Sequence, residues 1–152
     1  MRGKTLGIAV MMGVALGTAG PVIGAGHAAM PAQQFAVRIE NVSTENTLKP
    51  SNGAKAPAAV APGLWLIHRD GEPLFTPGKS DRGKGLESLA EEGNPSPLAM
   101  SLREQAGVIG SGVFNTPVGA NSPGPIGPGG TFEFTVSATP GTRLSFAMMF
   151  GQ

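Results

Sequence analysis

The sequence predicts a mainly β protein, an antiparallel β-sandwich with two short helices packed on one side. The chain has 152 residues with 24 glycines and 14 prolines, and 14% of its residues are charged, which is typical of loop-rich β structure. Several segments alternate apolar and polar residues, as half-buried strands do. The two segments with helical spacing are too short to be stable alone, so we expect them to pack against the strands.

Residues 1–28 have the pattern of an export signal peptide. Arg2 and Lys4 precede an uncharged apolar segment over 6–19, and Gly26-His27-Ala28 places small residues at the two key positions of a cleavage site. The alternative is an uncleaved membrane anchor, but the apolar segment is short for a bilayer span. We therefore expect a secreted or periplasmic protein with no stable membrane span after signal cleavage.

Charge and cysteine content limit the expected partners of the protein and the ways in which it can be stabilised. Without residues 1–28 the chain has nine basic and ten acidic residues and no basic run, so nucleic acid is not an expected partner. The absence of cysteine leaves packing, or a metal, to hold the domain together. The remaining length suits one small domain, which we assign to residues 34–152.

The first two predicted strands differ in burial. Residues 34–42 alternate and predict a strand with one apolar face. The apolar residues of that face are Phe35, Val37 and Ile39. A long loop follows over 44–62, and the apolar run Gly-Leu-Trp-Leu-Ile-His at 63–68 predicts a strand buried on both faces. We interpret Trp65, the single tryptophan, as a core anchor.

Two short helices are predicted between residues 83 and 107. In the first, apolar residues fall at i, i+3 and i+4, and these are Leu86, Leu89 and Ala90. Gly93 stands where a left-handed C-terminal cap is expected. The second helix has Ser96 as its predicted N-cap and Pro97 at the first helical position, and Gly107 closes it. Its apolar face consists of Leu98 and Leu102.

The C-terminal part of the chain returns to β structure. Residues 108–114 predict a short strand, and 119–130, rich in glycine and proline, predict a surface loop. Two alternating runs follow, with a turn at Pro140-Gly141 between them, and they predict a β-hairpin with aromatic pairs across it. The apolar residues of these runs are Phe132, Phe134, Val136, Leu144, Phe146, Met148 and Phe150.

Four sequence elements together resemble a known family. They are an apolar strand ending at His68, Gly-Leu-Glu-Ser-Leu-Ala-Glu-Glu-Gly at 85–93, Gly-Val-Phe-Asn-Thr-Pro at 112–117, and Leu-Ser-Phe at 144–146. In this order they resemble the spondin N-terminal domain, in particular its short, cysteine-free, secreted bacterial members. The resemblance implies a sandwich akin to C2 domains and a non-enzymatic role in binding or adhesion to a cell-surface or extracellular ligand.

The resemblance also implies a divalent cation, usually calcium, held by carboxylates at one end of the sandwich. The family's acidic ligand on the strand before Leu-Ser-Phe falls on Glu133. A second family ligand, an Asp beside a Trp, would lie beyond Gln152 with further strands, so we expect a sandwich that lacks its C-terminal strands. This chain is therefore expected to bind calcium weakly or not at all. The alternative to a ligand role for Glu133 is that of a solvent-facing residue on an amphipathic strand.

Two alternatives to a binding module stay open. One is an exported hydrolase that uses His68, the single histidine after residue 28, with Asp70 nearby and Ser80 or Ser111 as nucleophile. No Gly-x-Ser-x-Gly motif is present, and a lone histidine at a strand end is more often structural, so we assign no catalytic residue. The other alternative is a truncated fragment with no activity of its own.

Overall fold

The computed structural model describes residues 31–51 and 53–151, so the predicted signal peptide over 1–28 lies outside the described residues. The described residues form five strands and two helices. These elements are β1 (Gln33–Glu40), β2 (Ala59–His68), α1 (Leu86–Glu92), α2 (Ser96–Arg103), β3 (Val108–Phe114), β4 (Thr131–Ala138) and β5 (Arg143–Gly151).

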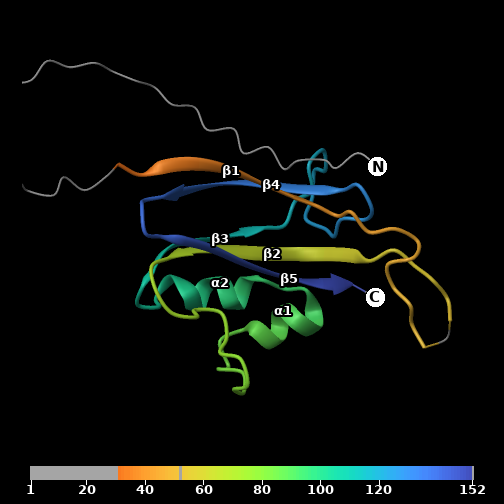
Figure 1. Ribbon diagram of the computed structural model, residues 1–152, viewed down its shortest axis with the longest axis horizontal. Helices are drawn as coiled ribbons and strands as arrows, with labels where there is room; N and C mark the ends of the chain where they lie inside the picture. The colour runs from red at the N-terminus through yellow and green to blue at the C-terminus, as the bar shows by residue number, and fades with distance from the viewer. Residues whose placement is uncertain (1–30, 52, 152) are drawn as a thin grey trace, which may run out of the picture.

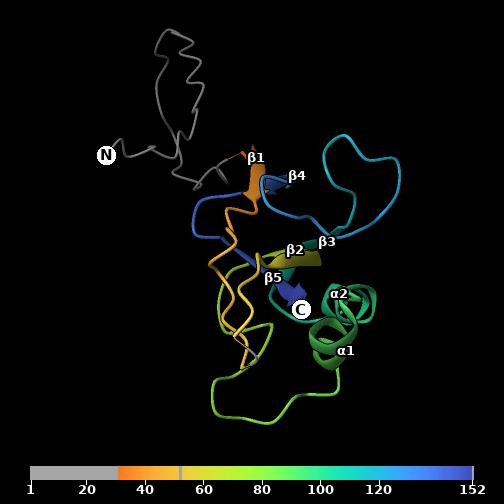
Figure 2. The same cartoon turned by 90° about the vertical axis from the view of Figure 1, so that its right-hand side faces the viewer.

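The strands form two antiparallel sheets. β1 pairs with β4, and β2 lies between β3 and β5 in a central three-stranded sheet. The β1–β4 sheet lies over one face of the central sheet, and α1 and α2 cover the other face (Figure 1, Figure 2). The described chain is therefore mainly β and sandwich-like with two short helices on one side, which confirms the predicted fold class.

β2 contributes to two hydrophobic cores, because residues of a strand point alternately to its two faces. Leu64 and Leu66 face the helices, where they pack with Leu89 of α1. The α2 residues in this core are Leu98, Ala99 and Leu102. On the other face, half-buried Trp65 packs against the core between the sheets, and its ring lies parallel to that of Phe134 with centroids 6.0 Å apart. The tryptophan therefore belongs to the core, as interpreted from the sequence.

The first helix forms where it was predicted, with one difference on its apolar face. Gly93 has a φ of 65° and ends α1 in the left-handed conformation. Leu86 and Leu89 pack towards the central sheet, but Ala90 is exposed. α1 is short and packs against α2 and the outer strand β5. It therefore buries only part of the apolar face that the spacing predicts.

The second helix differs from the prediction at both ends. α2 begins at Ser96, which is therefore a helical residue rather than the N-cap. The side-chain Oδ1 of Asn94 accepts a hydrogen bond of 3.1 Å from the backbone N–H of Ser96, so the asparagine satisfies this terminal donor instead. α2 ends at Arg103, and Gly107, with a φ of 87°, lies in the turn before β3 rather than at the helix end.

Both long loops contribute more to the core than the sequence predicted. β2 begins at Ala59, inside the segment expected as loop, and the backbones of Val60 and Ile126 exchange two hydrogen bonds of 2.9 Å. Ile126 is 2% exposed, although its segment, 119–130, was expected at the surface. The side-chain Nδ2 of buried Asn41 donates to the carbonyl of Ile126 at 2.9 Å. This bond helps to hold the glycine- and proline-rich loop against the core.

The predicted hairpin between the last two strands is wrong. β4 pairs with β1 along its whole length and β5 pairs with β2, so the turn at Pro140-Gly141 carries the chain from one sheet to the other. The crossing turns the face of each strand that carries its phenylalanines towards the layer between the sheets. The aromatic contacts therefore form across that layer. The ring of Phe114 in β3 is stacked on Phe134 at 5.1 Å and tilted against Phe132 at 5.3 Å.

Candidate functional site

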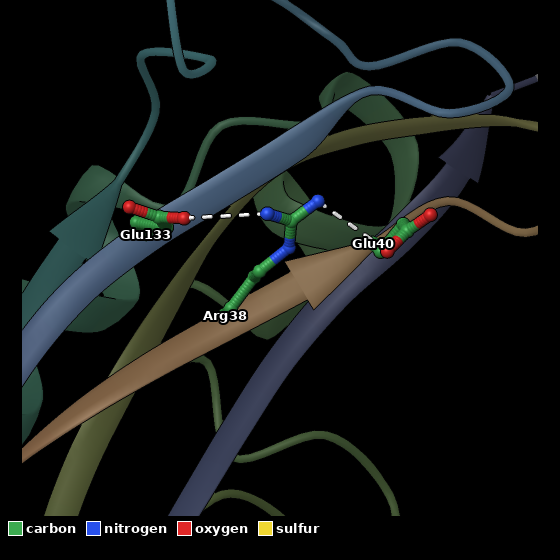
Figure 3. Close-up of polar contacts among 3 residues, drawn as sticks. All are labelled: Arg38, Glu40 and Glu133. Atoms are coloured by element: carbon green, nitrogen blue, oxygen red, sulfur yellow. Dashed lines mark hydrogen bonds and ion pairs between the residues drawn. The ribbon is translucent and has the colours of Figure 1, made fainter. Parts of the chain in front are cut away.

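Glu133 lies on the face of β4 that points away from the central sheet. It stands opposite Arg38 in the pairing of β1 with β4, and its carboxylate is 3.6 Å from a guanidinium nitrogen of Arg38. A guanidinium nitrogen of the same arginine is 3.4 Å from the carboxylate of Glu40. Figure 3 shows Arg38 between the two acidic side chains. All three side chains are about half exposed, so these ion pairs add little stability.

These residues do not fit the calcium site that the family resemblance implies. Calcium takes about six to eight oxygen ligands, whereas Arg38 places a positive charge between the carboxylates of Glu40 and Glu133. Within residues 31–51 and 53–151, no group of three or more His, Cys, Asp and Glu side chains is arranged to hold a metal ion. The geometry at Glu133 is that of a solvent-facing acidic residue paired with an arginine.

Calcium titration should show no saturable binding at micromolar concentration. Two exposed carboxylates that flank a guanidinium cannot replace the hydration shell of the ion. Isothermal titration calorimetry with calcium chloride measures this directly, and Glu133→Gln serves as the control variant. Micromolar affinity in the wild type that is lost in Glu133→Gln would contradict the expectation and restore this residue as a ligand.

His68 lies at the end of β2 on the face that points to the helices. Its side chain is buried, with 3% of the residue exposed, and its Nε2 lies 2.8 Å from Oγ of Ser145 on β5. Ser145 stands opposite Leu66 in the pairing of β2 with β5. Sequence reasoning missed this serine, because the predicted hairpin gave no reason to place β5 beside β2.

The residues expected to assist His68 in a hydrolase lie elsewhere. Asp70 is exposed beyond the end of β2, and Ser80 lines a separate hollow of about 270 Å³. Ser111 is on β3, and its buried hydroxyl has no hydrogen-bond partner among the described residues. The Nδ1 of His68 also has no such partner in the described part of the chain, although a catalytic triad places an acid there. Within residues 31–51 and 53–151, the serine–histidine pair thus has no acidic group that would orient the imidazole.

A hollow of about 280 Å³ opens beside the pair formed by His68 and Ser145. Both residues line it, together with Arg143 of β5. The rest of its lining comes from the loop after β2 and consists of Gly71, Glu72, Pro73, Leu74, Phe75 and Pro77. Arg82 fixes this loop, since its guanidinium donates to the carbonyl oxygens of Pro73 at 3.3 Å and Glu72 at 2.9 Å. The wall of the hollow is therefore held by hydrogen bonds.

A second candidate surface lies where the central sheet is not covered by the β1–β4 sheet. β4 packs over β2 and β3, and Phe146 of β5, which stands opposite Trp65, faces the same layer between the sheets. Four large apolar side chains on the inner faces of β1 and β5 are exposed, and we refer to them as the open-edge surface. They are Phe35 (39% exposed), Leu144 (37%), Phe146 (47%) and Phe150 (70%).

β5 is also an outer strand of the central sheet. Its backbone pairs with β2 on one side, and no strand among the described residues pairs with its other side. Arg143 is the single charged residue of β5. This edge therefore lacks the internal charges and prolines with which many proteins prevent strand addition.

The chain matches no family model, no curated protein and no solved structure. Among the described residues, no helix has both the length and the apolar character needed to cross a membrane. The hollow and the open-edge surface are therefore the features on which a functional proposal can rest.

Proposed function

We propose that this protein is a secreted, non-enzymatic binding or adhesion module of the spondin N-terminal type. One observation carries the proposal, namely that the large apolar side chains of the open-edge surface face the layer between the sheets and yet stay exposed. Clusters of exposed large apolar residues mark protein interaction sites in many soluble proteins. The sandwich-like fold and the export signal expected over residues 1–28 support an extracellular role.

The chemistry of the open-edge surface favours a protein ligand that presents an extended apolar segment. Such a segment can pair with the free edge of β5 through its backbone, while its alternate side chains cover Phe146 and Phe150. Burial of the two phenyl rings supplies the affinity, because aromatic side chains remove a large apolar area from water. The strand carries one charge, that of Arg143, so covering it costs little desolvation energy.

Binding at this surface does not require a metal ion. The open-edge surface consists of phenylalanine and leucine side chains, which are not ligands for calcium. Glu133 lies on the outer face of the β1–β4 sheet and is paired with Arg38. The calcium dependence implied by the family resemblance is therefore not part of the proposal for this chain.

Retention of the purified protein on immobilised cell-surface or matrix proteins tests the proposal. We expect the wild type to be retained in the presence of EDTA. The double variant Phe146→Ser, Phe150→Ser should lose retention by at least about tenfold, because a few buried aromatic residues dominate the energy of most interfaces. Ile109→Ser is the matched control, since Ile109 is 54% exposed on β3, at the opposite edge of the same sheet.

Equal retention of the wild type, the double variant and Ile109→Ser would reject the open-edge surface as the binding site. Loss of wild-type retention in EDTA would contradict the metal-independent mode. Gel filtration and thermal unfolding of each variant show whether a lost signal reflects unfolding or aggregation instead of a lost contact.

A further inference from the structure

The geometry points to a second ligand site, in the hollow beside His68 and Ser145, that takes a small carboxylate with an apolar body. This site lies on the helix-side face of β5, to which Arg143 and Ser145 belong. The open-edge surface uses the alternate residues of the same strand, which face the opposite side. The two sites are therefore separate, and this one does not depend on the proposed adhesion function.

The polar end of the hollow is a hydrogen bond between buried His68 and half-buried Ser145. His68 is 3% exposed, and its Nε2 lies 2.8 Å from Oγ of Ser145. A serine hydroxyl has one donor and two acceptor positions, so Ser145 can bond to the imidazole and still meet one polar group of a ligand. A few fixed polar groups in a mostly apolar hollow are what orients a small ligand in most binding sites.

Arg143 supplies a charge that the fold leaves unneutralised. It stands opposite His68 in the pairing of β2 with β5 and lines the hollow. Its guanidinium makes no ion pair or hydrogen bond with another side chain among the described residues. The planar fork of an arginine matches a carboxylate, which can accept two parallel hydrogen bonds from it. Glu72 also lines the hollow, and its negative charge acts against an anion.

The loop after β2 provides the apolar part of the site. Leu74, Phe75 and Pro77 line the hollow, and the ring of Phe75 is available to a ligand because that residue is 54% exposed. The hollow measures about 280 Å³, which is just below the usual range for ligand sites of about 300 to 1,000 Å³. A molecule of about ten non-hydrogen atoms with an aromatic ring, such as phenylacetate, suits this space.

An NMR titration with phenylacetate tests the site, and phenylacetamide serves as its neutral counterpart. The resonances of the His68 ring and of the Ser145 amide report binding in the hollow. We expect a Kd of about 1 mM for phenylacetate, as is typical of so small a ligand. Arg143→Gln should weaken it about tenfold because a charge-assisted bond is lost, and Glu72→Gln should strengthen it about twofold because a like charge is removed. Neither change should alter the affinity for phenylacetamide.

Arg69→Gln is the matched control, since Arg69 directly follows β2, does not line the hollow and carries the same charge. It should bind phenylacetate as the wild type does, whereas Phe75→Ala should weaken both probes. Arg143 is exposed, so its variant is expected to fold, which an unchanged thermal unfolding midpoint would verify. The proposal is overturned by absence of saturable phenylacetate binding up to about 20 mM, by equal losses in Arg143→Gln and Arg69→Gln, or by binding that leaves the His68 and Ser145 resonances unmoved.

Discussion

Replacing Gly63 by alanine is expected to lower the free energy of unfolding by about 2 to 3 kcal/mol, because the new methyl group overpacks the core. A Cβ at this position would lie 2.5 Å from Cζ of Phe114 and would also collide with the carbonyl oxygen of Ala147 in β5. Gly63 follows a bulge in the pairing of β2 with β5. The carbonyl belongs to the backbone of a paired strand, so it cannot move aside without breaking that pairing.

Gly110→Ala is the matched control for this substitution. Gly110 lies inside β3 of the same sheet, and neither glycine has a positive φ. A Cβ at Gly110 would have its nearest neighbour in the ring of Trp65 at 3.8 Å, an ordinary contact. We expect a change within about 0.5 kcal/mol, since alanine also restricts the unfolded chain. Urea unfolding with fitted m-values measures both variants, and equal losses would contradict the close packing of β2 against Phe114.

The elements that could be predicted from the sequence are those whose signal is local. β3 spans Val108–Phe114, as the short apolar segment at 108–114 predicted. The buried run of β2 was recognisable because a continuous apolar segment must be covered on both faces whatever its neighbours are. The left-handed cap at Gly93 depends only on the chain next to it.

Strand pairing could not be predicted, because alternation specifies a face and not a partner. A β4–β5 hairpin and the stacking of β4 over a second sheet would both bury the apolar faces of these strands. The structure has the second arrangement, since β4 pairs with β1 along Gln33–Glu40 and β5 pairs with β2. The burial of Ile126 has a similar cause, because its backbone partner Val60 lies far away in the sequence.

The candidate sites depend on the same long-range pairings. His68 was noticeable as a single histidine at a strand end, but Ser145 reaches it only through the pairing of β2 with β5. Glu133 was selected by family resemblance, and its neighbour Arg38 follows from the register of β1 with β4. The apolar residues of the open-edge surface were visible as an alternating pattern, but their exposure depends on which strands the β1–β4 sheet covers.

Phe132→Ala is expected to lower the free energy of unfolding by about 3 to 5 kcal/mol, the range for a fully buried phenylalanine. Phe132 is 0% exposed in the core between the sheets, and its ring packs against Phe114 at 5.3 Å. Truncation leaves a cavity that two paired sheets can close only in part. Since small domains are stable by about 5 to 15 kcal/mol, the variant should unfold at markedly lower urea concentration than the wild type.

Phe150→Ala makes the corresponding change on the open-edge surface. It is expected to reduce ligand binding and to leave the free energy of unfolding almost unchanged. Phe150 is 70% exposed, so its loss should change the free energy of unfolding by no more than about 0.5 kcal/mol. The same variant should reduce retention on the immobilised ligand, because the ring is free to contact a partner. Urea unfolding and the retention assay on both variants test this division of roles. If Phe150→Ala destabilised the fold as much as Phe132→Ala, the ring would be part of the core and the open-edge surface would not be free to bind.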